Sequence, residues 1–221
     1  MDKTKLPTDI ALDTIAHTYT RNGEVYTPVS RWMDRFVPPF EKDRIAEATA
    51  IRDGLEAQDI IDKWDLKGDY SRHWGTALHG AIEYLIKYGE LPDSPFLKEI
   101  IEDFTPFLKD EYKYISERMV YSDSERIAGT IDIIEVTKDH VVNLFDIKTT
   151  TNPEKTFGRL LPPFDDLPNS PLSKYRLQLS KYKQLIEEMA EVKVENLGAY
   201  VLQEDGWKLY EIEPLDLSIL N

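Results

Sequence analysis

The hydrophobic pattern changes its period near residue 111, and this change constrains the fold more than any other feature of the chain. Before it, apolar residues recur at helical spacing, most clearly over 72–90. After it, the alternating, β-branched runs RIAGTIDIIEV (126–136) and VVNLFDIKTT (141–150) are typical of strands. Helices followed by three strands, a helix and two more strands predict an α/β domain with a helical N-terminal part packed on its core.

The same patterns divide the chain into expected parts. We expect an N-terminal arm over 1–22 and one domain over 23–221, made of a helical part (23–110) and a strand-rich core (111–221). The proline-rich segment 151–170 has no clear period, and a loop of that length is usually functional or mobile, for example as a lid. The expected helices cover 9–19, 27–36, 41–57, 57–66, 72–90, 94–108 and 171–191, and the expected strands cover 116–122, 126–136, 141–150 and a hairpin over 196–212.

The charge and composition of the chain exclude several classes of protein. Its 221 residues carry a formal net charge of -14, which by itself argues against nucleic-acid binding because phosphate contacts need Lys and Arg. Carboxylates that hold a cation can make the electrostatic potential positive at one site despite the negative net charge. Without cysteine, the chain forms no disulfide, thiolate zinc site or cysteine-held iron–sulphur cluster. No apolar run approaches the ~20 residues that span a bilayer, and no secretion signal is recognisable, so we expect a cytoplasmic protein of a bacterial or phage-infected cell, with no membrane partner.

The stretch FDIKTT places a carboxylate and an ammonium two residues apart. On a strand, Asp146 and Lys148 project to one face, while Phe145 and Ile147 take the opposite, apolar face. A surface ion pair of little energetic value is one interpretation. Asp132 offers another, because its strand can pair with this one in a hairpin, although the sequence does not fix the register. Two neighbouring carboxylates repel, and a hard cation such as Mg²⁺ or Mn²⁺ removes the conflict.

His79 lies beside the apolar stripe of its expected helix. A lone helical histidine is more often a structural residue than a metal ligand, so both interpretations stay open. Glycines at positions 75 and 80 favour the functional one, because glycine in a helix costs stability and suggests close approach of a backbone or a substrate. Gln178 and Tyr182, four residues apart, share one face of a later helix.

Five motifs follow one another in order: GTALHGAIE with His79, ERMVYS with Glu117, AGTIDII with Asp132, FDIKTT with Asp146 and Lys148, and QLSKY with Gln178 and Tyr182. With this ordered set the chain resembles the RecB-like branch of the PD-(D/E)xK nuclease superfamily. The likeness spans about residues 24 to 210 and includes TPVSRWMDRF, which looks like the N-terminal helices of phage and mitochondrial single-domain members. The ordered set is much more specific than its D…DxK part alone.

The resemblance implies a restriction-endonuclease-like core, which is a mixed sheet flanked by helices, and a site for one or two Mg²⁺ or Mn²⁺ ions. The expected metal ligands are His79, Asp132, Asp146 and the backbone carbonyl of Ile147. The expected catalytic residues are Lys148, Gln178, Tyr182 and Glu117, the last with a role in positioning or in a second metal site. Because one ligand is an imidazole, we expect activity with Mn²⁺ at least equal to that with Mg²⁺. Many relatives hold an iron–sulphur cluster with four cysteines, which this chain lacks.

The implied activity is metal-dependent hydrolysis of DNA, by an exonuclease acting on single strands or on DNA ends. A structure-specific or restriction-type endonuclease and a non-catalytic, partner-binding relative are the alternatives. Because no G-x-x-x-x-G-K-[ST] motif occurs, unwinding would need a helicase partner, and a recombinase or a single-strand-binding protein are the other partners expected. The candidate nucleic-acid contacts are Arg31, Arg72, Thr149, Lys155 and Arg159, with Arg35, Lys174 and Arg176 as further cations and Trp32, Trp74 and Phe157 as stacking rings.

Overall fold

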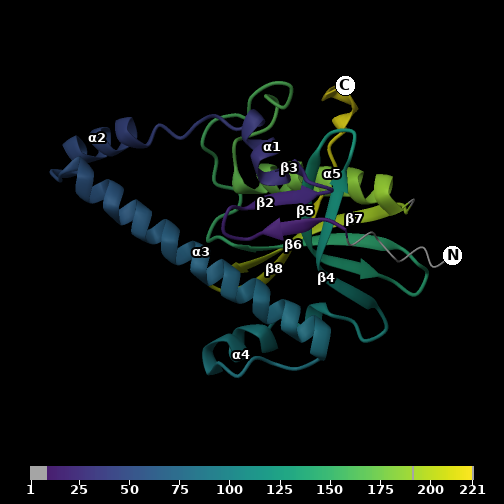
Figure 1. The fold of residues 1–221 in the computed structure, drawn as a ribbon. Coiled ribbons are helices and arrows are strands. Elements are labelled where there is room, and N and C mark those ends of the chain that lie inside the picture. The colour runs from purple at the N-terminus through teal and green to yellow at the C-terminus, as the bar shows by residue number, and fades with distance from the viewer. Residues whose placement is uncertain (1–8, 191, 221) are drawn as a thin grey trace.

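The computed structural model describes residues 9–190 and 192–220 (Figure 1). Its helices are α1 (Val29–Met33), α2 (Lys42–Asp53), α3 (Ala57–Tyr88), α4 (Pro95–Glu102) and α5 (Pro171–Ala190), with short 3-10 turns at Asp34–Phe36, Thr105–Phe107 and Leu217–Leu220. Its strands are β1 (Ala11–Asp13), β2 (Thr18–Arg21), β3 (Glu24–Pro28), β4 (Lys113–Ser122), β5 (Ile127–Val136), β6 (Val142–Thr149), β7 (Val194–Gln203) and β8 (Gly206–Ile212).

In the described residues these strands form one mixed sheet of eight. Its order is β1-β2-β3-β5-β6-β7-β8, and β4 pairs with the remaining edge of β5. The pairs β3–β5 and β6–β7 are parallel, and the other pairs are antiparallel. The expected α/β class, with a mixed sheet flanked by helices, is confirmed.

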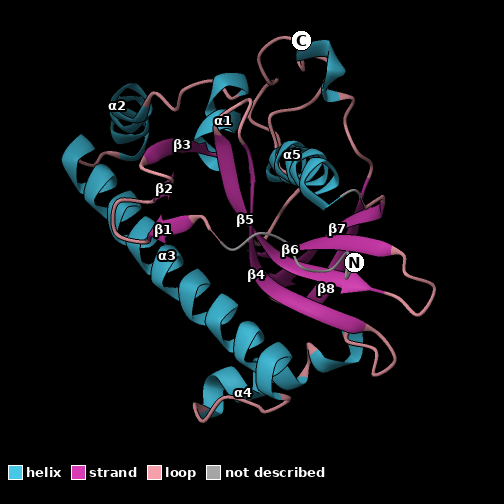
Figure 2. Cartoon of the chain, turned by 45° about the vertical axis from the view of Figure 1, so that its right-hand side comes forward, coloured by secondary structure: helices cyan, strands magenta, loops and turns pink. Residues whose placement is uncertain are grey.

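Helices cover both faces of the sheet, and Figure 2 shows α3 and α5 on either side of it. One face packs against α1 and α5 around Trp32, Leu177 and Leu185. The other packs Phe145 and Ile147 against the C-terminal half of α3 and against α4. The alternation in FDIKTT therefore directs its apolar residues toward α3, which leaves Asp146 and Lys148 for the opposite side.

The helical part differs from the prediction in where its helices begin and end. The helices expected over 57–66 and 72–90 are one continuous helix, α3, because nothing in between stops it. Its first half and α2 extend away from the sheet in Figure 1 and form a small apolar core of their own. The helix expected over 27–36 is shorter, since Thr27 and Pro28 end β3, and the one expected over 94–108 is α4 followed by a 3-10 turn.

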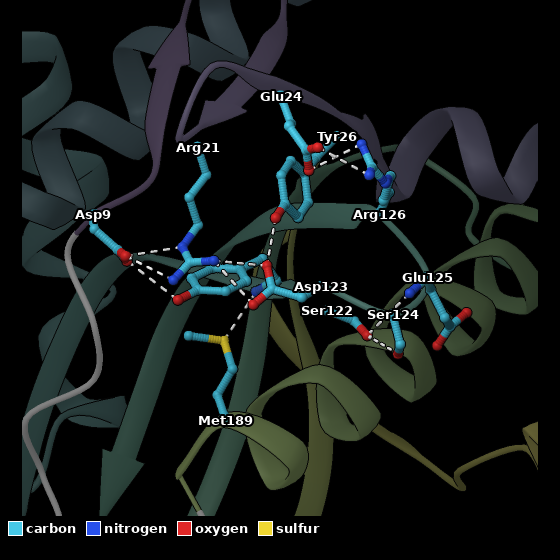
Figure 3. A network of polar contacts seen from close by, with 11 residues as sticks. Asp9, Arg21, Glu24, Tyr26, Ser122, Asp123, Ser124, Glu125, Arg126 and Met189 are labelled. Carbon is cyan, nitrogen blue, oxygen red and sulfur yellow. Dashed lines mark hydrogen bonds and ion pairs between the residues drawn. The ribbon is translucent and has the colours of Figure 1, made fainter.

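The helix predicted over 9–19 is wrong, because these residues form β1 and the start of β2 instead. The side chain of Asp13 starts the turn between these strands, because its Oδ1 accepts hydrogen bonds from the backbone N–H groups of Ile15 and Ala16, both at 2.9 Å. Arg21 then fastens the hairpin by ion pairs with Asp9 and with Asp123 of the β4–β5 turn (Figure 3). Residues 1–8 of the predicted arm lie outside the described residues.

The long loop 151–170 is present as predicted, but its middle is anchored. Leu160 and Phe164 are buried, and the Phe164 ring packs edge-on against Phe36, with their centroids 5.0 Å apart. The Leu161 N–H donates to the Phe36 carbonyl at 2.8 Å. These contacts fix the loop on the 3-10 turn after α1, so the idea of a freely moving lid is not supported.

In the part of the chain that the structure describes, no helix combines the length and the apolar character needed to cross a bilayer.

Candidate metal centre

The candidate site lies where the sheet divides beside β5. β4 pairs along one whole edge of β5. The other edge is shared: β3 pairs at Ile127 and Ala128, and β6 pairs only from Ile133 onward. Among the residues that the structure describes, 129–132 therefore have no strand partner on that edge, and Asp132 is the last residue before the pairing with β6 begins. Side chains, rather than backbone groups, have to satisfy the polar atoms at this fork.

Three carboxylates form a row across the fork, which we call the carboxylate row: Glu117, Asp132 and Asp146. The β4–β5 register pairs Ser116 with Ile133 and Arg118 with Ile131, so Glu117 lies opposite Asp132. The β5–β6 register pairs Ile133 with Phe145, so Asp146 is the next residue opposite Asp132. Like charges at directly opposite positions destabilise a sheet. The row is therefore a costly arrangement unless something positive is held against it.

The backbone positions two members of the carboxylate row, Asp132 through a hydrogen bond and Glu117 through an unusual φ angle. Asp132 is 8% exposed, and its Oδ2 accepts a hydrogen bond from the backbone N–H of Ile147 at 2.7 Å. This bond joins β6 to β5 where the strands separate. Glu117 has a φ of 49°, which is in the left-handed region although the residue lies in the middle of β4. Such a conformation costs on the order of 1–3 kcal/mol in a non-glycine residue and is concentrated at functional sites.

His79 of α3 faces the carboxylate row with one ring nitrogen and the backbone with the other. Its Nε2 donates to the Ile147 carbonyl at 3.0 Å, and its Nδ1 lies 3.6 Å from both Glu117 Oε1 and Asp132 Oδ2. One ligand atom from each of these three side chains lies within 4.8 Å of the others. Burial lowers the pKa of His79, but the charge on Asp132 and contact with Glu117 outweigh it and raise the pKa to about 9.

Two of the expected site residues, Ile147 and Glu117, take the following positions in the structure. The Ile147 carbonyl accepts the hydrogen bond from His79, so it orients the imidazole and fixes its tautomer, as carbonyls behind metal-binding histidines commonly do. Glu117, expected to act in positioning or in a second metal site, is grouped with His79 and Asp132 in the described residues, with ligand atoms within 4.8 Å of one another, and Asp146 is not part of that group.

Asp146 and Lys148 extend the site toward α5. Asp146 is 1% exposed and forms an ion pair with Lys148, yet neither of its oxygens receives a well-directed hydrogen bond from the described residues. Burial raises the pKa of Asp146 to about 7; the Lys148 ammonium opposes this shift and Asp132 adds to it. Burial favours the neutral amine of Lys148, but the charges on Asp146 and Asp132 outweigh it and raise its pKa. The Lys148 ammonium lies 5.5 Å from the centre of the Tyr175 ring.

The α5 residues Gln178 and Tyr182 share one face, as expected, and the Gln178 Nε2 donates to the Tyr182 hydroxyl at 3.1 Å. Tyr182 packs directly on Gly129, where a Cβ would lie 2.5 Å from Tyr182 Cε1. Sequence reasoning missed Gly129, although a glycine inside a strand indicates close approach of another group. It also missed Tyr19 of β2, whose hydroxyl lies 2.9 Å from Thr130 Oγ1 at the fork.

The glycines that prompted the prediction for His79 have a different explanation. A Cβ at position 75 or 80 would meet nothing within 4 Å, so neither glycine is required by close approach of a neighbouring group in this structure. The expectation of a closely packed backbone at those two residues was therefore wrong, and close approach of a substrate there stays a prediction.

The expected nucleic-acid contacts fall into two groups. Arg159 Nη1 donates to the Asp165 and Asp166 carbonyls at 3.3 and 2.9 Å, and Arg176 donates to the Glu213 and Pro214 carbonyls at 2.6 and 3.4 Å, so both hold loops of the chain. Trp32 is 2% exposed, which excludes it as a stacking ring, and Trp74 packs in part against Phe96. The remaining residues lie at least partly at the surface: Arg31, Arg35, Arg72, Thr149, Lys155, Phe157 and Lys174. Among them Arg72 pairs with Asp69.

The donor set fits a hard divalent cation. Carboxylates with one imidazole suit Mg²⁺ or Mn²⁺ rather than a thiolate-preferring metal. Asp146 Oδ2 is paired with the Lys148 ammonium, whereas Oδ1 has no hydrogen-bond partner among the described residues and is suited to accept a cation.

Comparison with known proteins adds little. No family model and no curated protein matches the chain. Among solved structures, the crystal structure of SSO0001 is similar, with 19% identity over 75% of this chain and 84% of that chain, and a TM-score of 0.35. A superposition of that quality supports no functional argument.

Proposed function

We propose that the chain is a divalent-metal-dependent deoxyribonuclease with a restriction-endonuclease-like core of the RecB-like kind. The observation that carries the proposal is the carboxylate row, which lies against the imidazole of His79 and beside the ammonium of Lys148. A surface ion pair between Asp146 and Lys148 does not account for it, because Asp146 is buried and two more carboxylates lie next to it.

Each side chain has a role that follows from its position. His79 Nδ1, Glu117 and Asp132 would hold the ion, with Asp146 as a further oxygen ligand. A divalent ion bound there supplies Lewis-acid stabilisation of a phosphate. Lys148 keeps its proton because of the carboxylates around it, so it is suited to stabilise negative charge that develops on a phosphodiester.

The residues behind these groups keep them in place. The Ile147 carbonyl holds the imidazole of His79, and the Ile147 N–H holds Asp132, so one peptide segment orients both. Tyr182, hydrogen-bonded to Gln178 and packed on Gly129, fills the space between α5 and the fork. The ring of Tyr175 limits the positions that the Lys148 ammonium can take. Such support is what fixes a site within a fraction of an ångström.

The test is digestion of end-labelled single-stranded, double-stranded and closed circular single-stranded DNA with Mn²⁺ or Mg²⁺. We expect cleavage of the linear substrates, with Mn²⁺ at least as effective as Mg²⁺, and no cleavage when the ions are chelated. Asp132→Asn should abolish cleavage, whereas Asp205→Asn, which removes an exposed partner of Lys208, should not.

The outcomes separate the alternatives. Cleavage of the circle would assign an endonuclease instead of a strict exonuclease. Absence of cleavage with either ion, combined with a melting temperature that neither ion raises, would contradict the metal site itself.

A further inference from the structure

The side of α3 that is turned away from the sheet carries a row of large, exposed side chains. Leu66, Tyr70 and Tyr88 are 72%, 71% and 65% exposed, and Tyr84 is 39% exposed. Because 3.6 residues make one helical turn, these four positions lie on one side of the helix, which we call the outer face. Figures 1 and 2 show α3 running along the outside of the molecule. Single exposed apolar side chains are ordinary, but a contiguous row of them marks an interaction surface.

A hollow of about 360 Å³ interrupts this row. The residues that α3 contributes to it are Ala77, Gly80, Ala81 and Tyr84. Positions with the spacing i, i+3, i+4 and i+7 form the hole that receives one side chain of a facing helix in knobs-into-holes packing. A Cβ at Gly80 would meet nothing within 4 Å, so the hollow is open. The Tyr84 hydroxyl donates to Glu90 at 2.9 Å, which holds the ring as one wall of the hollow.

The same helix also carries a side chain that matches the hollow. Tyr70 lies ten residues before Gly80, which is about 15 Å along the helix axis. If a second copy of α3 lies antiparallel against the first, Tyr70 of each copy reaches the hollow of the other, because a two-fold axis makes every contact twice. Leu66 then lies against Tyr84 of the second copy. A helix of an unrelated protein would have to supply both a knob and a hole at this spacing, whereas a second copy has them already.

Charged residues beside the outer face fit the same arrangement. Asp62, Asp69 and Lys87 share one flank of α3, since they are two and five full turns apart. The register set by Tyr70 places Lys87 of one copy within one turn of Asp62 of the other. The Asp62 carboxylate accepts a hydrogen bond from a neighbouring glutamine but forms no ion pair with any described residue. Asp69 comes near Glu83 of the second copy, but Arg72 and Lys87 already pair with these two carboxylates within one helix.

The exposed rings supply enough area for a dimer. Phe96 of α4 is 62% exposed and packs on Trp74, with the ring centroids 5.4 Å apart, so it adds a fourth ring beside the outer face. An aromatic side chain buries about 150–250 Å². With the exposed fractions above, the eight rings of two copies would bury about 1,000 Å², which is the lower limit for a specific interface. A dimer of this size should be reversible.

We propose that the outer face of α3 binds a second copy of this chain, antiparallel and about a two-fold axis near position 75, with Tyr70 of each copy in the hollow beside Gly80 of the other. The inference does not depend on the proposed nuclease function, because His79 faces the carboxylate row on the side of α3 that packs toward the sheet. Both metal centres stay accessible in this dimer.

Sedimentation equilibrium of the full chain, at concentrations from about 1 to 200 μM, measures the association. The mass should rise with concentration toward twice the 25.7 kDa of one chain. Tyr70→Ala should raise the dissociation constant by about 30-fold or more, because each dimer loses two central aromatic side chains. Phe157→Ala is the matched control, since this ring is 60% exposed but lies in the loop 151–170, and it should change the constant by less than about twofold.

Cross-linking tests the register. The chain has no cysteine, so an introduced thiol is the single site for a bismaleimide. Ala77 is exposed on the outer face, two residues from the expected axis, so Ala77→Cys of two copies should be joined by a short linker. Asp205→Cys, exposed in the turn between β7 and β8, should give no covalent dimer at the same concentration.

The outcomes decide the inference. A wild-type mass of one chain at every concentration would overturn it, and so would equal dissociation constants for Tyr70→Ala and Phe157→Ala. A dimer in which Asp205→Cys is joined and Ala77→Cys is not would place the interface elsewhere and overturn it as well. Melting curves check that Tyr70→Ala is folded; its ring is exposed in one chain, so a loss of dimer with a normal melting transition at low concentration supports the outer face.

Discussion

Two lysines in this protein each lie near a carboxylate and an aromatic ring. They differ in whether the oxygens of that carboxylate are hydrogen-bonded. Lys181 of α5 donates to both oxygens of Glu125 at 2.6 Å and to Gln184 at 2.9 Å, near the Trp32 ring. Lys148 of β6 pairs with Asp146 near the Tyr175 ring. The Asp146 carboxylate, however, is buried without a directed hydrogen bond from the described residues, and a second carboxylate lies beside it.

This difference distinguishes a lysine that stabilises the fold from a lysine at the candidate site. A lysine whose partners are all satisfied holds elements together, here α5 and the β4–β5 turn. A lysine beside additional carboxylates and unsatisfied oxygens lies where, on the function proposed above, a metal ion would bind. The presence of a buried ion pair therefore does not by itself distinguish the two kinds of lysine. The number of neighbouring polar atoms that lack a hydrogen bond does.

The largest expected difference between the two lysines is in the rate of DNA cleavage. Lys148→Ala should lower the rate of DNA cleavage by about 10²–10³-fold or more, because a group that stabilises charge in the transition state is lost. Lys181→Met should leave the rate per folded molecule within about threefold, since no atom of the site is removed. Initial rates on end-labelled DNA measure both. Equal losses in the two variants would contradict the distinction.

The next effect concerns pH and the metal. The raised pKa values of His79, about 9, and Asp146, about 7, mean that the folded, metal-free protein holds protons that the unfolded chain has already released. Its stability should therefore fall as the pH rises from about 4 to about 7, where Asp146 loses its proton, and from about 6.5 to about 9, where His79 does. A metal ion displaces these protons, so its affinity should rise over the same range, by about tenfold per pH unit for each proton displaced.

Thermal unfolding across that pH range, with and without Mn²⁺, checks this expectation. The stabilisation by Mn²⁺ should increase with pH in the wild type and in Lys181→Met. Asp146→Asn should show a smaller pH dependence, because it has lost one of the two titrating groups. A stabilisation that grows toward acid pH would have the wrong sign.

The third effect concerns stability and is expected for Lys181 rather than for Lys148. Lys181→Met should destabilise the fold by about 1.5–3 kcal/mol, the usual loss when hydrogen bonds to a charged group are removed. The side chain of Glu125 is 36% exposed and can turn to water, which limits the cost. Lys148→Ala should cost less, because Asp146 can take up a proton once the ammonium is gone. Urea unfolding compares the two.

The sequence predicts those features of the candidate site that depend on local hydrophobic patterns. The alternation in FDIKTT places Asp146 and Lys148 away from the apolar face, and the helical spacing places Gln178 and Tyr182 together. The left-handed backbone of Glu117 and its position opposite Asp132 depend on strand register, which no local pattern fixes.

The N-terminal strands could not be predicted for a similar reason. Arg21, on β2, is held by Asp123, more than a hundred residues later in the chain, and β3 pairs with β5 through only Thr27 and Pro28. These partners are distant in sequence, so the local pattern over 9–19 could be taken for a helix. Tertiary pairing overrides such weak local preferences.

The smallest expected effects compare two kinds of glycine. Gly129→Ala should destabilise the protein by about 1–3 kcal/mol, the cost of overpacking, because the new Cβ would lie 2.5 Å from the ring of Tyr182 and 3.0 Å from Val29. The displaced Tyr182 should also lower the cleavage rate, although less than the loss of Lys148 does. Gly80→Ala is the matched control, because its Cβ meets nothing within 4 Å.

Gly80→Ala should stabilise the protein by about 0.5–1 kcal/mol, since alanine in an exposed helical position loses less backbone entropy on folding than glycine. It lies one residue after His79, so an unchanged cleavage rate would also show that the helix around the imidazole does not need glycine. A large loss of cleavage in Gly80→Ala with normal stability would instead restore the sequence-based interpretation that a substrate approaches this helix closely. The opposite signs expected at positions 129 and 80 therefore distinguish a glycine required by the site from one that merely lies beside it.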